Sequence, residues 1–227
     1  MDASRRLLWG GGLLLVLMCA TITAVAPDVE GVRQVIRATA RTSLLFFLLA
    51  YTAQAFFALW PGALTRWVRQ HRRQWGLLLV ISHTLHAMGI VSLGLMAPEL
   101  FQVLAPLGNR ITGGLAYVLL WSMGATSFDR TAQWLGPKRW AQLHTWGSHY
   151  IWLSFVVANG KRVAQDPVYL WPTALLFGAL GLRLVARVAQ REVAVGTQRR
   201  VQALHRAAVH QHLAQAVVFR CAAVAPV

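Results

Sequence analysis

Apolar residues in this chain gather into six long stretches that are separated by short polar segments. A helix that crosses a lipid bilayer needs roughly 20 mostly apolar residues, and each stretch has about that length. The polar segments contain Pro and Gly, which interrupt helices. The pattern predicts an all-α integral membrane protein, a six-transmembrane-helix bundle with spans over residues 7–25, 42–60, 75–97, 111–127, 143–159 and 170–187.

The six stretches take up nearly all of the 227 residues. Only 13% of the residues are charged, whereas a soluble domain carries about 25%. We expect no separate soluble domain and three regions: a first transmembrane helix with a periplasmic loop (1–40), the main helical bundle (41–187) and a basic amphipathic cytoplasmic tail (188–227). Within the tail, Gln198–Val218 has the pattern of an amphipathic helix that lies on the inner membrane face.

The first stretch also has the look of a signal peptide, because Arg5 and Arg6 precede its apolar run. The run is long for a signal peptide, however, and five further apolar stretches follow it. We therefore favour an uncleaved first helix.

The distribution of positive charge predicts the orientation in the membrane. The net charge is +15, but the charges lie between the apolar stretches, so a nucleic-acid partner is set aside. Sixteen of the 22 Lys and Arg residues fall on one side of the predicted membrane and six on the other. Because the cytoplasmic side of a membrane protein carries the excess of Lys and Arg, both termini are expected in the cytoplasm, with the chain in a bacterial inner membrane. The excess charge also favours contact with anionic lipid headgroups.

Four histidines lie inside two of the apolar stretches. His83 and His86 fall in the third, and His144 and His149 in the fifth. An imidazole in a membrane-spanning helix is costly and normally faces the bundle interior. Neutral imidazole is a good ligand for haem iron, and cofactor sites in helical bundles are built from side chains on facing helices. The pattern therefore points to a membrane protein that holds haem, although histidines that only hydrogen-bond neighbouring helices remain an alternative.

Three segments and one histidine resemble the ferric-reductase-like transmembrane domain family, and within it the haem-binding membrane subunits of bacterial methionine sulfoxide reductase systems. The segments are 72–77 (RRQWGL), 125–128 (ATSF) and 135–144 (LGPKRWAQLH), and the histidine is His86, ten residues after Gly76. The resemblance covers roughly residues 40–187. It implies electron transfer across the membrane through b-type haem, held by histidines on the third and fifth helices. His86 and His144 fall on matching positions and would be ligands of the haem iron.

The chain departs from the family pattern at two positions. The family's second histidine on the fifth helix corresponds to Val157, and a histidine found in related two-haem oxidases corresponds to Arg72, next to His71. One haem at most is therefore expected.

The depth of the two expected ligands also differs. His86 lies near mid-membrane and His144 at the inner mouth of its span, a mismatch of about eight residues, or roughly 12 Å. Other pairings stay open: His71 with His144 matches better in depth, and His83 or His86 with His149 is intermediate. His83 and His86 are spaced i,i+3 and share one helix face, whereas His144 and His149 diverge.

The sequence contains no Gly-x-Gly-x-x-Gly after a strand and no room for a flavin or nicotinamide domain. FMN or FAD would therefore act only through a partner. The electron donor would be a cytoplasmic flavoprotein or the quinone pool, and the electron acceptor would be periplasmic. The basic loops around Arg66–Arg73 and Lys138–Arg139 have two interpretations. We favour the first, in which they only set the topology; in the second they contact an acidic donor or haem propionates.

The expected function is that of a membrane-embedded haem b electron-transfer protein, the membrane component of an oxidoreductase. A haem-free membrane scaffold or assembly partner with the same fold is the alternative. A transporter is disfavoured, because the apolar stretches lack Asp and Glu and no internal repeat is evident.

Overall fold

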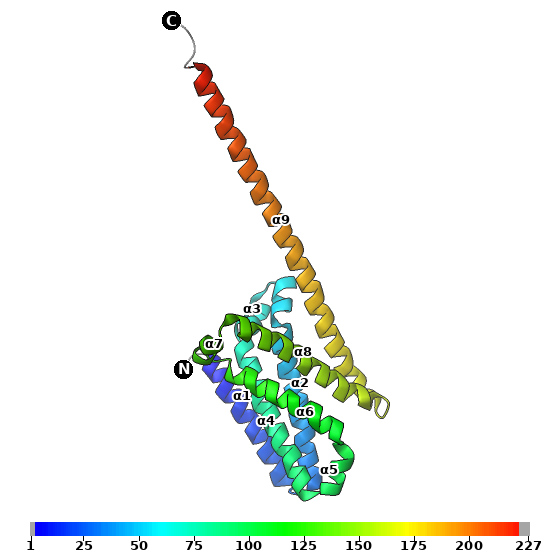
Figure 1. Ribbon diagram of the computed structural model, residues 1–227. Coiled ribbons are helices and arrows are strands. Elements are labelled where there is room, and N and C mark those ends of the chain that lie inside the picture. Colours follow the sequence, from blue (N-terminus) through cyan, green and yellow to red (C-terminus); the bar gives the residue numbers. More distant parts are fainter. Residues whose placement is uncertain (1–2, 223–227) are drawn as a thin grey trace. The chain divides into compact units, whose positions relative to one another are not determined.

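The computed structural model describes the backbone of residues 3–222 and the side chains of residues 3–198. All regular structure in this part of the chain is helical, which confirms the all-α prediction. The helices are α1 (Ala3–Val25), α2 (Val29–Leu59), α3 (Ala63–Gln70), α4 (Arg72–Met96), α5 (Pro98–Leu104), α6 (Leu107–Ala125), α7 (Asp129–Leu135), α8 (Pro137–Val163) and α9 (Leu170–Ala222), with a short 3₁₀ turn at Pro167–Tyr169 (Figure 1).

Four to five of these helices are long and apolar enough to cross a membrane. They are α1, α2, α4 and the stretch Pro167–Gln198, and α5 with α6 forms a fifth span if this pair, bent by 82°, is counted as one. The chain is thus a multi-pass membrane protein. The helix expected over 143–159 is present within α8, but its many polar residues keep α8 out of this apolar set among the described helices.

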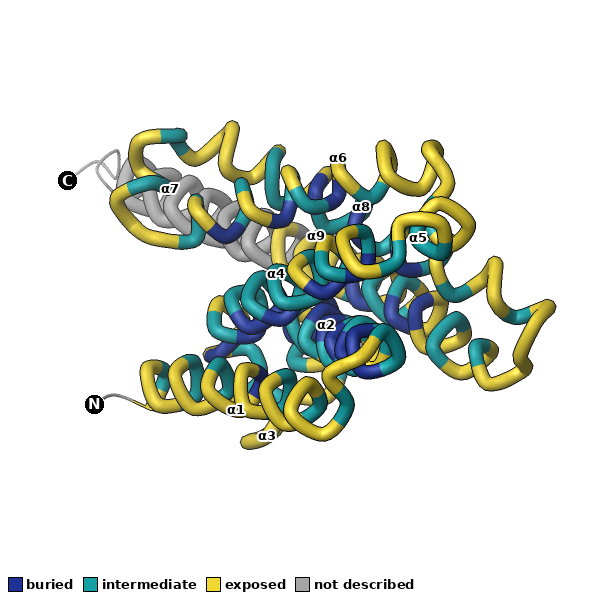
Figure 2. Tube along the Cα trace, turned by 90° about the horizontal axis from the view of Figure 1, so that it is seen from below, coloured by how far each residue is buried: buried dark blue, intermediate teal, exposed yellow. Residues whose placement is uncertain are grey.

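The chain divides into two compact units, residues 1–183 and 184–227. In the first unit, α2 packs along α4, α1 packs against both, and α6 packs against α4 and α8. Figure 2 shows the buried positions concentrated on α2 and α4. The second unit is helical to Ala222, because α9 runs without a break from the expected sixth span into the tail. The side chains that would make Gln198–Val218 amphipathic lie, but for Gln198, outside the described residues.

The second long helix begins 13 residues earlier than the hydropathy pattern predicts, so the expected loop before residue 42 is mostly helical. The Asp28 side chain caps the helix and accepts a hydrogen bond from the Gly31 backbone N–H at 2.9 Å. The Glu30 carboxylate then pairs with Arg33 at 2.8 Å and with Arg37 at 2.9 Å. Hydropathy alone missed this start, because polar residues extend α2 through a cap and ion pairs.

A row of buried hydroxyl groups joins α2 to α4. Ser82 Oγ donates to the backbone oxygen of Thr39 at 3.1 Å and lies 2.9 Å from Ser43 Oγ and 2.8 Å from Thr42 Oγ1. Ser82, Ser43 and Thr39 are fully buried. Small hydroxyl residues let two helices approach closely and hydrogen-bond across the contact, so this row fixes α2 against α4.

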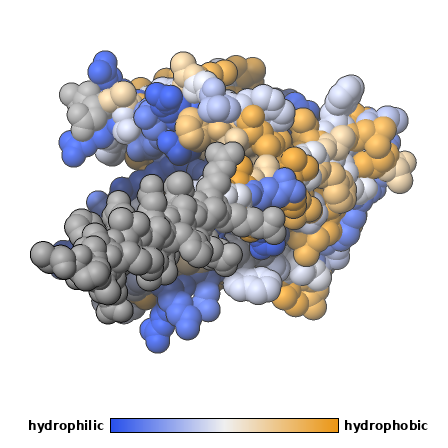
Figure 3. All heavy atoms as spheres, turned by 90° about the horizontal axis from the view of Figure 1, so that it is seen from above, coloured by the Kyte–Doolittle hydropathy of each residue, from blue (hydrophilic) through white to orange (hydrophobic). Residues whose placement is uncertain are grey.

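The apolar core has two parts. Leu15, Trp75 and Leu78 hold α1 against α4. The larger cluster joins α2, α4, α6, α8 and the start of α9 through Phe47, Tyr51, Leu79, Leu120, Ile151, Phe155, Leu176 and Ala179. Figure 3 shows hydrophobic side chains gathered toward the right of the face in view, with hydrophilic ones among them and toward the left.

We expect Gly31→Ala to lower the thermal unfolding midpoint in detergent. A Cβ at Gly31 would collide with the backbone oxygen of Ala26, and a backbone atom cannot move aside as a side chain can. Overpacking of this kind costs about 1–3 kcal/mol, or a drop of several degrees for a chain of this size. Gly10→Ala is the control: a Cβ there meets nothing within 4 Å, and Ala favours the helix by up to about 1 kcal/mol. An equal midpoint for both variants would contradict this account of the α1–α2 turn.

Candidate functional site

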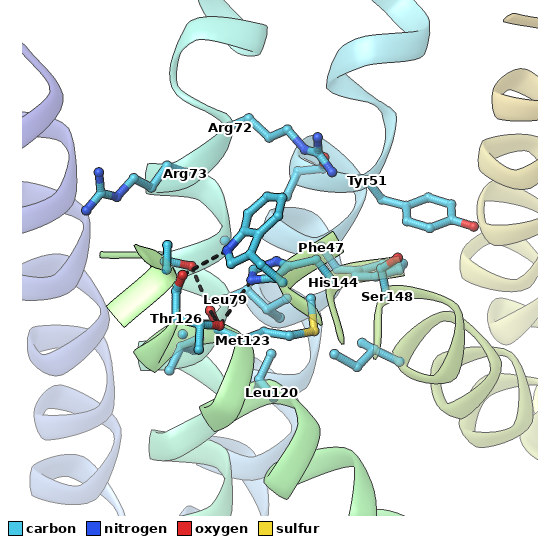
Figure 4. A pocket seen from close by; sticks show the side chains of 18 of the residues that line it. Phe47, Tyr51, Arg72, Arg73, Leu79, Leu120, Met123, Thr126, His144 and Ser148 are labelled. Carbon is cyan, nitrogen blue, oxygen red and sulfur yellow. Dashed lines mark hydrogen bonds between the residues drawn. The ribbon is translucent and has the colours of Figure 1, made fainter. Parts of the chain in front are cut away.

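A cavity of about 330 Å³ lies between α2, α4, α6, α7 and α8. This volume falls at the lower end of the range for small-molecule sites. The walls are apolar toward the core, where Phe47, Leu79, Leu120 and Ile151 line them. The rim is polar and carries Arg72, Arg73, Arg183, Asp129, His144 and Ser148. Figure 4 labels four of these, Arg72, Arg73, His144 and Ser148.

His144 is held rigidly at the cavity wall. Its Nε2 lies 3.2 Å from Thr126 Oγ1, and its ring stacks on Trp140 with the centroids 4.2 Å apart. The Thr126 hydroxyl donates its hydrogen to the Ser122 backbone oxygen at 2.7 Å, so it accepts from His144 Nε2–H. The imidazole therefore has its lone pair on Nδ1, because the partner of one ring nitrogen selects the tautomer.

Trp140 is itself fixed by a hydrogen bond from Nε1 to the Thr126 backbone oxygen at 2.9 Å. The dashed lines in Figure 4 mark these contacts of Thr126 with Trp140 and His144. Both segments that carry the contacts, 125–128 and 135–144, are those singled out in the sequence. Their local role is thus to position one imidazole.

Two arginines of the rim are anchored on consecutive carbonyl groups of α2. Arg72 Nε donates to the Ala50 oxygen at 3.1 Å. Arg183 Nη1 donates to the Tyr51 oxygen at 2.9 Å, and its guanidinium lies 3.9 Å above the centre of the Tyr51 ring. The third rim arginine, Arg73, pairs with Asp129 at 3.3 Å. These contacts hold positive charge at one end of the cavity.

His83 and His86 lie farther along α4 and do not line the cavity. Their rings stack with centroids 5.2 Å apart, which confirms that the i,i+3 spacing places them on one face. His86 Nδ1 lies 3.0 Å from the Ile36 oxygen, an acceptor, so Nδ1 carries the hydrogen and Nε2 the lone pair. His83 Nδ1 and the Tyr117 hydroxyl are buried without a hydrogen-bond partner within the described residues.

The remaining two candidate histidines point elsewhere. His149 Nδ1 lies 3.1 Å from the Tyr51 hydroxyl. His71 is buried at the α3–α4 corner, where its Nδ1 lies 2.8 Å from the Trp67 oxygen. His144 faces α6 while His149 faces α2, so the two α8 histidines diverge as their spacing predicts.

The depth mismatch expected between His86 and His144 recurs in the structure. His144 shares its cavity with Gly76 of α4, and His86 lies ten residues farther along α4, roughly 15 Å away along the helix axis. A layer containing Leu79 and Ile151 closes the cavity on that side. Of the five predicted histidines only His144 lines this cavity, and within the described residues no three His, Cys, Asp or Glu side chains converge on a metal position.

Sequence reasoning missed two residues of the site. Tyr51 and Arg183 come from the second and last apolar stretches and meet each other at the rim. An arginine inside a predicted transmembrane span was the available signal, because such a charge normally faces the bundle interior. The charge distribution alone places Arg183 only among the sixteen basic residues on the expected cytoplasmic side.

These features define the class: a multi-pass helical membrane protein with an amphipathic cavity inside its helix bundle. No protein-family model, curated protein or solved structure matches the chain.

Proposed function

We propose that this chain is a membrane-embedded haem b electron-transfer protein that passes electrons across a bacterial inner membrane from a separate donor. The observation that carries the proposal is His144, held in one tautomer at the wall of a cavity with an apolar interior and an arginine rim. Neutral imidazole ligates haem iron. The family resemblance of the segments around His86 and His144 points to the same cofactor.

In this proposal, His144 would be the one histidine of the cavity that holds the haem. His144 offers Nδ1 as the ligand nitrogen, Phe47 and Leu120 offer apolar walls, and the wall at Gly76 opens into space, since a Cβ there would meet nothing within 4 Å. The expected second ligand, His86, does not line this cavity. His86 does have the tautomer typical of a metal ligand. Its Nδ1–H donates to a backbone carbonyl, which leaves the lone pair of Nε2 for a metal.

Haem, when bound, supplies one-electron oxidation and reduction. The protein's part is to hold His144 through Thr126 and Trp140, to exclude water with the buried side chains of Leu79, Leu120 and Ile151, and to fix Arg72 at the rim. The electron donor in this proposal is a cytoplasmic flavoprotein or a quinol, and the acceptor is periplasmic.

We further propose six spans, with α8 as the fifth, and both termini in the cytoplasm. Sixteen of the 22 Lys and Arg residues lie on that side. A reporter fused after Val227 should be active only in a form that works in the cytoplasm. Activity of a periplasm-dependent reporter, such as alkaline phosphatase, at the same position would contradict this orientation.

The purified protein from haem-replete cells should show the absorption spectrum of a b-type haem after reduction by dithionite, with no more than one haem per chain. Among single Ala variants of His71, His83, His86, His144 and His149, we expect His144→Ala to lose the most haem, because it removes the imidazole at the cavity. His86→Ala should lose more than His149→Ala, since His86 is at the position that matches a ligand in the family resemblance.

Matched expression and an unchanged elution volume are the controls for this series. Full haem content in both the His86 and His144 variants would show that the ligands are wrong. A colourless wild-type protein would favour the alternative, a haem-free membrane scaffold. One observation speaks for that alternative: His144, His149, His71 and His86 all have hydrogen bonds within the protein.

A further inference from the structure

The two ends of the His144 cavity have opposite chemistry. Its interior is formed by side chains of the apolar core, among them Leu79, Leu120 and Ile151, which are almost fully buried. Its rim carries three guanidinium groups and a single carboxylate, that of Asp129. Because Asp129 lies 3.3 Å from Arg73, the lining has a net positive charge at the end where Arg72 and Arg183 lie.

The arginines at this end are oriented before any ligand arrives. Arg72 uses Nε to bond the Ala50 oxygen, and its terminal nitrogens have no partner among the described side chains and backbone. Arg183 is anchored on the next carbonyl, that of Tyr51, and stacks over the Tyr51 ring. The planar guanidinium of Arg72, whose terminal N–H groups are open, matches carboxylate and phosphate oxygens, and it binds them more strongly when it is held in place.

A small inorganic anion would satisfy the rim but not the interior. Apolar walls next to a cationic rim favour a ligand that has both characters, because binding sites bury most of the surface of their ligand against matching groups. Gly76 leaves room for the apolar part, since a Cβ there would project into open space.

We propose that this cavity binds an anionic amphiphile, whose carboxylate or phosphate group lies at Arg72 and Arg183 and whose apolar body lies against Leu79, Leu120 and Ile151. This chemistry has two sources in a membrane: an acidic phospholipid, or haem with its propionate groups. The assignment of the anion-binding end does not depend on which of the two is bound, so it goes beyond the haem function proposed above.

The test uses full-length protein from haem-replete cells in a mild detergent. Haem content is measured by the pyridine haemochrome method, and lipid binding by native mass spectrometry with added phosphatidylglycerol or phosphatidylcholine. The variants are Arg72→Gln, which removes the anion contact, and Gly76→Leu, which fills the cavity. Arg66→Gln is the matched control, a basic residue of α3 that does not line the cavity.

The wild type should bind one ligand, either haem or phosphatidylglycerol. If the ligand is lipid, the affinity for phosphatidylcholine should be at least tenfold weaker than the affinity for phosphatidylglycerol. Arg72→Gln should weaken that binding about tenfold, as expected for a hydrogen bond to a charged group. Gly76→Leu should abolish it, and Arg66→Gln should leave it unchanged. If Gly76→Leu does not fold, Ser148→Leu fills the cavity from α8.

The outcomes separate this inference from the haem function. A colourless protein whose phosphatidylglycerol binding is weakened in Arg72→Gln and lost in Gly76→Leu supports the amphiphile site and overturns the haem function. Haem that is bound and unaffected by either variant supports the haem function and overturns the amphiphile site. Equal losses in Arg66→Gln and Arg72→Gln would show only attraction to a basic surface and overturn the site, as would a wild type that binds neither ligand.

Discussion

The hydrocarbon interior of a membrane offers no hydrogen bonds, so every polar group inside this bundle needs a partner within the protein or a ligand. The α2–α4 contact meets this requirement with a chain of short side chains. Ser82 bonds Thr42, Ser43 and the Thr39 backbone at the centre of the seam, and His86 continues it one turn farther through the Ile36 carbonyl. Helices α1 and α3 pack against both members of this pair, and α6 packs against α4.

The cavity follows from how the remaining helices approach that pair. Close contacts fix α6 on both sides: a Cβ at Gly124 would come within 2.9 Å of Val80 on α4, and one at Gly147 of α8 within 2.5 Å of Met123. With α6 between them, α4 and α8 border an open space near Gly76 and His144, although His83 and Phe155 meet farther along, with ring centroids 5.9 Å apart. The apolar interior and arginine rim of this cavity suit a ligand with an apolar body and an anionic group better than they suit water.

Hydropathy was enough to locate the helices but not all of their ends. The runs at 7–25 and 75–97 match α1 and α4 closely, because uninterrupted apolar residues have one stable form in lipid. The start of α2 was missed, since it depends on the Asp28 cap. The sequence pattern over 125–144 did identify the environment of His144. It did not identify the contact between Tyr51 and Arg183 at the rim, because these residues are 132 positions apart and no local pattern predicts such a contact.

The most direct test of the central claim is a cryo-electron microscopy map of the full-length protein in lipid nanodiscs. The account predicts non-protein density that begins between Arg72 and Arg183 and extends along Gly76 toward Leu120, beside the His144 ring. A map in which neighbouring side chains fill this space would contradict the claim that the cavity holds a ligand.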